Sequence, residues 1–97
     1  MHIDNLKDEA LDNLFKGVLA LQTVEECYQF FDDLCTANEI IALKQRFQVA
    51  TLIKQGKTYS EIEEITGTSS ATISRVRRAL EYGSDGYHTI IDRLKNN

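Results

Sequence analysis

Apolar residues recur along most of the chain at intervals of three and four, the spacing that places them on one face of an α-helix. No stretch shows the apolar–polar alternation of a half-buried strand over a useful length. The pattern therefore predicts an all-α fold. The expected helices cover residues 4–21, 23–34, 37–55, 58–67, 70–82 and 87–95, and Asn96 and Asn97 are expected to fray.

Capping residues support these boundaries. A threonine is followed three residues later by a glutamate at Thr23, Thr36 and Thr58. In such a capping box the threonine side chain accepts the amide of the glutamate, and the glutamate accepts the amide of the threonine. Gly56 and Gly67 follow the last apolar residues of two helices and suit the left-handed conformation common at helix ends. Each of these helices thus has a start or stop signal of its own.

The segment 58–82 consists of a short helix, a glycine turn and a second helix. Apolar positions of both helices lie at helical spacing: Ile62, Ile65, Ile73, Val76 and Leu80. The other face of the second helix carries Ala71, Ser74, Arg75 and Arg78. Small side chains allow approach to base edges, and arginines bind phosphates or guanine. This arrangement is typical of a helix-turn-helix whose second helix enters the major groove of DNA.

An ordinary helical hairpin would show the same spacing, and the first helix of the segment is acidic, with Glu61, Glu63 and Glu64. The alternative is therefore a helix-turn-helix protein-interaction module without specific DNA binding, either similar to a sigma-factor region or binding polymerase or another regulator. Specific binding to double-stranded DNA would weaken steeply with added salt, which separates the two hypotheses.

Charge is distributed unevenly along the chain, whose net charge is −4. Residues 1–35 contain eight acids and two bases, a net charge of −6, whereas residues 36–97 contain seven acids and nine bases, a net charge of +2. The bases form two runs: Lys44, Arg46, Lys54 and Lys57, then Arg75, Arg77 and Arg78. Basic charge is thus concentrated in and just before the helix-turn-helix, as expected for a DNA-binding segment.

With 97 residues, the chain has the length of one small domain, 1–97. The apolar content of residues 11–53 is large for so small a monomer, and a second copy would cover it. We therefore expect a homodimer formed by the helices of residues 4–55, with the helix-turn-helix at 58–82 and a C-terminal helix at 87–95.

Several classes of protein are not expected. No apolar run is long enough to span a bilayer and no signal peptide opens the chain, so a cytoplasmic protein without membrane association is expected. Cys27, Cys35, His2 and His88 lack the spacing of metal ligands, and no metal or cofactor is expected. No activated nucleophile, paired carboxylate motif or phosphate-binding loop is found, which argues against an enzyme.

The stretch LCTANEIIALKQRFQVATLIKQGKTYSEIEEITGTSSATISRVRRALE resembles the Trp repressor superfamily, and within it the YerC/YecD-type proteins. The specific parts are the LCT-x-x-E segment, the arginine ten residues after Thr36, and the ATISR run. The resemblance implies a six-helix TrpR-like fold and an intertwined homodimer. It also implies transcriptional regulation, usually repression, with helix 70–82 in the major groove.

The resemblance extends the set of expected DNA-binding residues, which all lie on the two helices of the helix-turn-helix: Ser60, Ser70, Ala71, Thr72, Ser74, Arg75 and Arg78. Basic residues of the family fall at Ser60 and Glu63 here. A serine cannot form the bidentate contact to guanine that an arginine forms. The operator sequence is therefore expected to differ from that of the Trp repressor.

An effector pocket can be compared in the same way. Thr36, Arg46 and Arg75 match the family's ligand-binding positions, whereas Val76 replaces a glycine and Ala79 replaces a serine. The valine adds bulk where the family leaves room for the ligand, and the alanine removes a polar contact. L-Tryptophan is therefore not expected to bind, and an unidentified small-molecule effector stays open.

Overall fold

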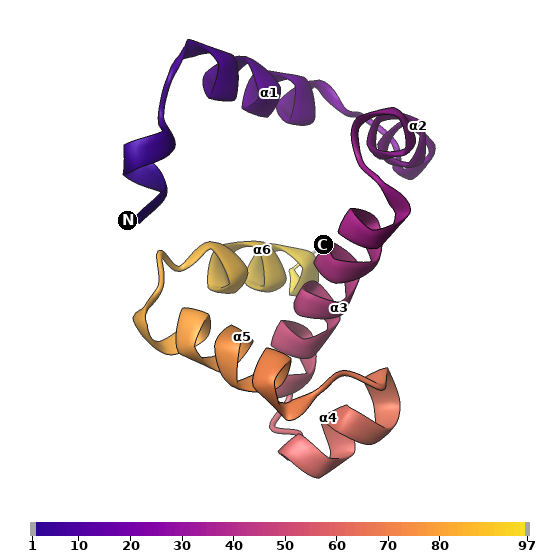
Figure 1. Ribbon diagram of the computed structural model, residues 1–97, viewed down its shortest axis with the longest axis vertical. Helices are drawn as coiled ribbons and strands as arrows, with labels where there is room; N and C mark the ends of the chain where they lie inside the picture. Colours follow the sequence, from indigo (N-terminus) through magenta and orange to yellow (C-terminus); the bar gives the residue numbers. More distant parts are fainter. Residues whose placement is uncertain (1, 97) are drawn as a thin grey trace. The chain divides into compact units, whose positions relative to one another are not determined.

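The structure, a computed structural model, describes residues 2–96. A 3-10 turn, η1 (His2–Leu6), precedes six helices (Figure 1): α1 (Glu9–Ala20), α2 (Val24–Leu34), α3 (Ala37–Lys54), α4 (Tyr59–Thr66), α5 (Ser70–Tyr82) and α6 (Gly86–Lys95). These residues contain no strand, so the all-α prediction is confirmed. The fraying expected at Asn97 lies outside the described residues. No described helix has both the length and the apolar character needed to cross a bilayer.

The first helix was expected over residues 4–21, and this prediction was wrong at its start. Asp8 has extended backbone angles and accepts the amide of Leu11 at 2.8 Å, so α1 begins only at Glu9. A side-chain cap of this kind satisfies an amide that has no partner within the helix. The residues before it form the separate turn η1.

Two of the three expected capping boxes, at Thr36 and Thr23, differ in how completely they form. Thr36 and Glu39 form the complete box, with distances of 2.8 and 3.2 Å between the amide nitrogens and the side-chain oxygens. Thr23 accepts the amide of Glu26 at 3.0 Å, but the Glu26 carboxylate accepts the amide of Gln22 at 2.8 Å. The box at Thr23 is therefore only half formed, because the carboxylate reaches one residue further back.

The chain divides into two compact units, one ending at Ile40 and the other beginning at Ile41. In the first unit, a Cβ added at Gly17 would lie 3.7 Å from the ring of Phe30, so α1 and α2 approach each other there. No side chain of α1 or α2 is fully buried. Leu19, Val24 and Tyr28 are 84%, 73% and 73% exposed. The apolar stripes of these helices are thus largely uncovered in the monomer.

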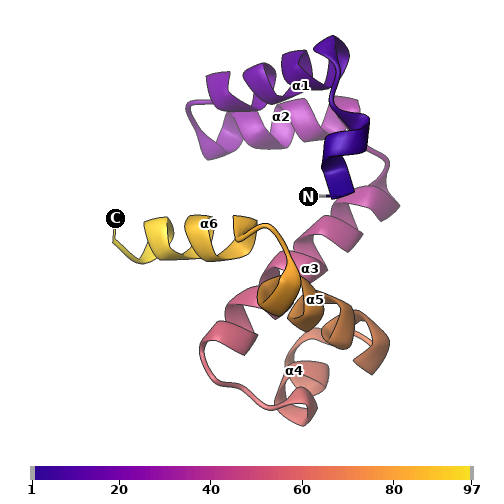
Figure 2. The same cartoon turned by 90° about the vertical axis from the view of Figure 1, so that its left-hand side faces the viewer.

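The second unit has the only cluster of buried apolar side chains among the described residues. It draws on α3, α4, α5 and α6. Its members are Val49, Ala50, Ile62, Ile73, Val76, Leu80 and Ile91. The expected inner faces of the helix-turn-helix are correct except at Ile65, which is 52% exposed. Figures 1 and 2 show α4 and α5 joined by a short turn near the C-terminal end of α3.

Candidate nucleic-acid interface

The first helix of the helix-turn-helix, α4, begins as expected. Glu61 donates its amide to the Thr58 hydroxyl at 3.2 Å, and Thr58 donates its amide to the Glu61 carboxylate at 3.0 Å. The backbone hydrogen bond from Thr58 lowers the pKa of Glu61 because it favours the ionised carboxylate. The buried Ile62 then fixes α4 on the core. The start of α4, and the face that α4 turns toward the core, are therefore both set by residues of the predicted pattern.

The turn between the two helices is held by side-chain hydroxyls as well as by glycine. Gly67 has a φ of 69°, in the left-handed region that glycine adopts without steric cost. The Thr66 hydroxyl bonds to the carbonyl oxygen of Ile62 at 2.7 Å and accepts the amide of Thr68 at 3.1 Å. The hydroxyls of Thr66 and Thr68 are also hydrogen-bonded to each other. Thr68 is therefore buried within the turn and does not cap the next helix.

Ser69 is the residue that caps the second helix of the helix-turn-helix, α5. Its hydroxyl accepts the amide of Thr72 at 3.3 Å, and the two hydroxyl oxygens lie 3.3 Å apart. Thr72 is half-buried, whereas Ser70 next to the cap is exposed. Among the expected DNA-binding residues, Thr72 thus belongs in part to the cap and is less available to a partner than its neighbours.

The remaining expected DNA-binding residues are exposed: Ser60 on α4, and Ser70, Ala71, Ser74, Arg75 and Arg78 on α5. Those of α5 lie opposite the buried residues Ile73, Val76 and Leu80. Within residues 2–96, neither Arg75 nor Arg78 forms an ion pair or a hydrogen bond. Two guanidinium groups are therefore available to an anionic partner on the outer face of α5.

This face is a shallow hollow of about 480 Å³, lined entirely by α5: Ala71, Ser74, Arg75, Arg77, Arg78, Glu81 and Tyr82. Tyr82 is 80% exposed and was missed as a candidate. Its spacing from Ala71, Arg75 and Arg78 could have revealed it, because intervals of three and four share one helix face. Its ring extends the exposed stripe to the C-terminal end of the helix.

Arg77 differs from the two arginines beside it. Its Nε lies 3.2 Å from a carboxylate oxygen of Glu81, and its guanidinium carbon lies 5.7 Å from the centre of the Tyr59 ring. The Glu81 contact follows from the i, i+4 spacing, and the Tyr59 contact joins α5 to α4. The sequence grouped Arg77 with the available basic residues, but its charge is already paired.

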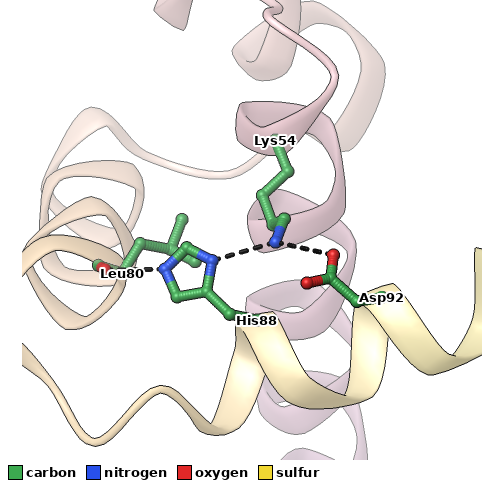
Figure 3. A network of polar contacts seen from close by, with 4 residues as sticks. All are labelled: Lys54, Leu80, His88 and Asp92. Carbon is green, nitrogen blue, oxygen red and sulfur yellow. Dashed lines mark hydrogen bonds and ion pairs between the residues drawn. The ribbon is translucent and has the colours of Figure 1, made fainter.

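Lys54, which was expected to belong to the first run of available basic residues, is also paired. Its ammonium lies 3.1 Å from a carboxylate oxygen of Asp92 and 2.9 Å from Nδ1 of His88, as Figure 3 shows. Its side chain is 15% exposed. The lysine was expected to add to the positive charge before the helix-turn-helix, whereas it joins α3 to α6. These contacts span 34 and 38 residues, so the spacing of the sequence gives no sign of them.

The residues of the expected effector pocket lie in different environments. Thr36 belongs to the first unit, where it caps α3, and Arg46 is half-buried on the part of α3 in the second unit. Val76 is 2% exposed and belongs to the apolar core, whereas Ala79 is exposed. Arg75 is exposed on α5. The bulk of Val76 therefore already serves the packing of α5, and the pocket stays a prediction.

Known proteins with a similar sequence share this architecture. The family model described as Trp repressor protein matches residues 9–95. Protein YerC of Bacillus subtilis, itself uncharacterised, is 55% identical over 95 residues, which cover 98% of this chain and 91% of YerC.

Solved structures agree with the sequence matches. A candidate Trp repressor from Staphylococcus aureus has a TM-score of 0.95 at 58% identity, over 98% of this chain and 95% of that one. A TrpR-like protein from Eubacterium eligens has a TM-score of 0.91 at 49% identity, over 95% of both chains. The helix order, the helix-turn-helix and these matches together show that the chain belongs to the Trp repressor family.

Proposed function

We propose that this protein is a sequence-specific DNA-binding transcriptional regulator, a repressor, that inserts α5 into the major groove. The family is regulatory rather than enzymatic, which agrees with this role. One observation carries the proposal. The outer face of α5 presents small side chains first and then Arg75 and Arg78, both without an anionic partner within residues 2–96. We also propose a cytoplasmic location, because the relatives are bacterial and bacterial DNA lies in the cytoplasm.

The dimensions of α5 suit this task. Its 13 residues span about 20 Å, enough to lie along a groove wide enough for one helix. Ser70 and Ala71 at its N-terminal end leave room for base edges, and Arg75 and Arg78 follow on the same face. The N-terminal residues of a recognition helix are those that reach the bases in a helix-turn-helix.

We propose further that two copies act together, joined through the helices of residues 4–55. The exposed apolar side chains of α1 and α2, such as Leu19 and Tyr28, support this arrangement because a monomer would leave them in water. A dimer would present two copies of α5, and its operator would be a palindrome with half-sites about one helical turn apart.

The test begins with a duplex that the protein selects from a random-sequence pool. Replacing both Arg75 and Arg78 with alanine should weaken binding to this duplex by about 1–3 kcal/mol for each base contact that is lost. Arg93→Ala on α6 removes the same charge from an exposed residue outside α5 and is the matched control. Fluorescence anisotropy measures the affinities and circular dichroism checks the fold. Unchanged affinity of the double variant would remove α5 from the interface.

The alternative is a helix-turn-helix that binds a protein without specific DNA binding. The exposed Glu63 and Glu64 on α4 favour it, because carboxylates repel phosphates. The dependence of DNA affinity on salt decides between the two. If α5 binds DNA, affinity should fall steeply with salt, and the double arginine variant should show a shallower slope because fewer counterions are released. Failure to enrich any duplex from the pool would favour the alternative.

A further inference from the structure

Tyr82 is the last residue of α5 and belongs to none of the contacts described so far. Its side chain is 80% exposed and is not part of the apolar cluster of the second unit. Within residues 2–96, its hydroxyl forms no hydrogen bond. The phenol group is therefore available to a partner outside the chain.

The side chain extends the stripe that the proposed function assigns to DNA. Tyr82 follows Arg78 by four positions, Arg75 by seven and Ala71 by eleven. These intervals keep residues on one face of a helix. The hollow of about 480 Å³ on α5 is lined by Tyr82 together with these three residues. The phenol group and the two unpaired guanidinium groups thus belong to one surface.

The acidic neighbour of Tyr82 does not make this end of the stripe negative. Glu81 lines the same hollow, but a carboxylate oxygen of Glu81 lies 3.2 Å from Nε of Arg77. The charges of this pair offset each other, whereas Arg78, one turn before Tyr82, has no acidic partner within residues 2–96. A phosphate that approaches Tyr82 would therefore meet a surface of net positive charge.

The backbone that carries Tyr82 is held in place on both sides. Gly83 donates its amide to the Ala79 oxygen at 2.9 Å. From α6, Nε2 of His88 lies 2.8 Å from the backbone oxygen of Leu80 (Figure 3). The end of α5 is thus fixed to its surroundings while the tyrosine side chain extends into water.

The place of Tyr82 along α5 favours a phosphate over a base as its partner. From Ala71 to Tyr82 the helix rises about 16 Å, whereas the major groove is about 12 Å wide. If the N-terminal end of such a helix reaches the base edges, its C-terminal end extends to the sugar–phosphate backbone, as the reading helix of homeodomains does. A phenol hydroxyl can donate a hydrogen bond to a phosphate oxygen.

We propose that Tyr82 is a DNA-contacting residue whose hydroxyl donates a hydrogen bond to a backbone phosphate at the wall of the major groove. This inference rests on the proposed DNA-binding function. The contribution of Tyr82 differs in kind from that of Arg75 and Arg78. A neutral hydroxyl releases no counterion, and a phosphate contact reads no base, so its loss should be the same for every sequence and salt concentration.

The test measures the affinity of Tyr82→Phe for the duplex selected from the random-sequence pool and for duplexes with one base pair changed, at several salt concentrations. Phenylalanine keeps the ring, and the exposed position leaves no cavity. Tyr87→Phe removes a hydroxyl from α6, where the ring packs against the core, and is the matched control. Arg78→Ala is the reference for the loss of a charge, and circular dichroism checks the fold.

Tyr82→Phe should bind every duplex about threefold to tenfold more weakly, the change expected when one hydrogen bond is lost. Its dependence on salt should equal that of the unmodified protein, whereas Arg78→Ala should show a shallower one. Tyr87→Phe should bind as the unmodified protein does. If Arg78→Ala weakens binding while Tyr82→Phe does not, or if the loss in Tyr82→Phe is confined to one sequence, the phosphate contact is overturned and the proposed function stands.

A second measurement locates the phosphate. Single phosphates of the selected duplex are replaced in turn by neutral methylphosphonates. One replacement should weaken binding of the unmodified protein more than binding of Tyr82→Phe, because both changes remove the same contact. If no replacement distinguishes the two proteins, Tyr82 does not bind a phosphate. If the unmodified protein enriches no duplex from the pool, the proposed function fails and this inference fails with it.

Discussion

At the scale of single residues, two glutamates that help to start helices also make the stability of the fold depend on pH. Glu39 and Glu61 accept the amides of Thr36 and Thr58, and these backbone hydrogen bonds lower the pKa of each carboxyl below its ordinary value of 4.5. A lowered pKa in the folded state means that the contribution to stability is fully present above the pKa of the unfolded chain. It is lost as the pH falls through the folded pKa.

We therefore expect Glu61→Gln to reduce the acid sensitivity of folding. Glutamine can still accept the amide of Thr58, but it does not titrate, so the free energy of unfolding should fall less between pH 7 and about pH 3. Urea unfolding at several pH values measures this. Glu63→Gln is the matched control, because Glu63 lies on the same helix and forms no cap. Equal pH dependence of the Glu61 and Glu63 variants would contradict the prediction.

The second residue-scale prediction concerns L-tryptophan, which we expect neither to bind at micromolar concentration nor to strengthen DNA binding. Val76 occupies a position where related pockets need glycine, and its side chain is buried in the core. Ala79 offers no hydroxyl, so polar groups of the ligand would be left unpaired. Calorimetric titration and DNA binding in the presence of tryptophan test this, and micromolar affinity would show that the pocket was misassigned.

Val76→Gly tests whether the valine is the block, but it also removes a core side chain and costs about 1 kcal/mol through the lower helix propensity of glycine relative to alanine. Val76→Ala is therefore the necessary control for folding. Binding of tryptophan to the glycine variant alone, with α5 still helical, would identify Val76 as the obstacle.

At the scale of the element, α5 has a buried face that stabilises the core and an exposed face that we propose binds DNA. Ile73, Val76 and Leu80 form the buried face, and Ser74, Arg75 and Arg78 are exposed. Helical geometry forces this division, because neighbours in sequence point about 100° apart while residues three or four apart share a face. Substitutions at adjacent positions should therefore have unrelated effects.

Ile73→Ala should lower the free energy of unfolding by about 2–5 kcal/mol, because it leaves a cavity in the core. Ser74→Ala, at the next position, should change it by about 0.5 kcal/mol or less, because the serine is exposed and the new side chain suits a helix. Urea unfolding of both variants measures the contrast. Similar losses from the two substitutions would mean that the face of α5 next to Ser74 is covered.

At the scale of the whole molecule, the first unit leaves a large apolar surface without cover. Neither α1 nor α2 has a fully buried side chain. Apolar surface costs about 25 cal/mol for each Å² left in water, so side chains as exposed as Leu19 and Tyr28 favour association. Membership of the Trp repressor family also suggests dimerisation.

We expect the protein to sediment as a homodimer at micromolar concentration. Leu19→Glu should shift it toward the monomer, because the new carboxylate would be desolvated in an apolar interface. Asn13→Glu adds the same charge at an exposed polar position of α1 and is the matched control. A monomer in the unmodified protein would contradict both the dimer and the palindromic operator.

Much of the candidate site could be predicted from the sequence. The start of α4 at Thr58, the turn at Gly67 and the buried face of α5 all follow from contacts between residues three or four apart. Which basic side chains remain unpaired could not be predicted from the sequence. Lys54 and Arg77 were counted with the basic residues, whereas both are held by acids or rings of other turns and helices. Spacing reveals which face a residue shares and not which distant group neutralises it.

The sequence by itself determined the number of helices, most of their ends and the outer face of α5, because capping and periodicity are local properties of the chain. Only the tertiary structure decided that Asp92 pairs with Lys54 and that His88 completes the end of α5. The last of these needs α3, α5 and α6 to meet. Its two hydrogen bonds join residues 34 and eight positions apart, and helix packing, not spacing, brings them together.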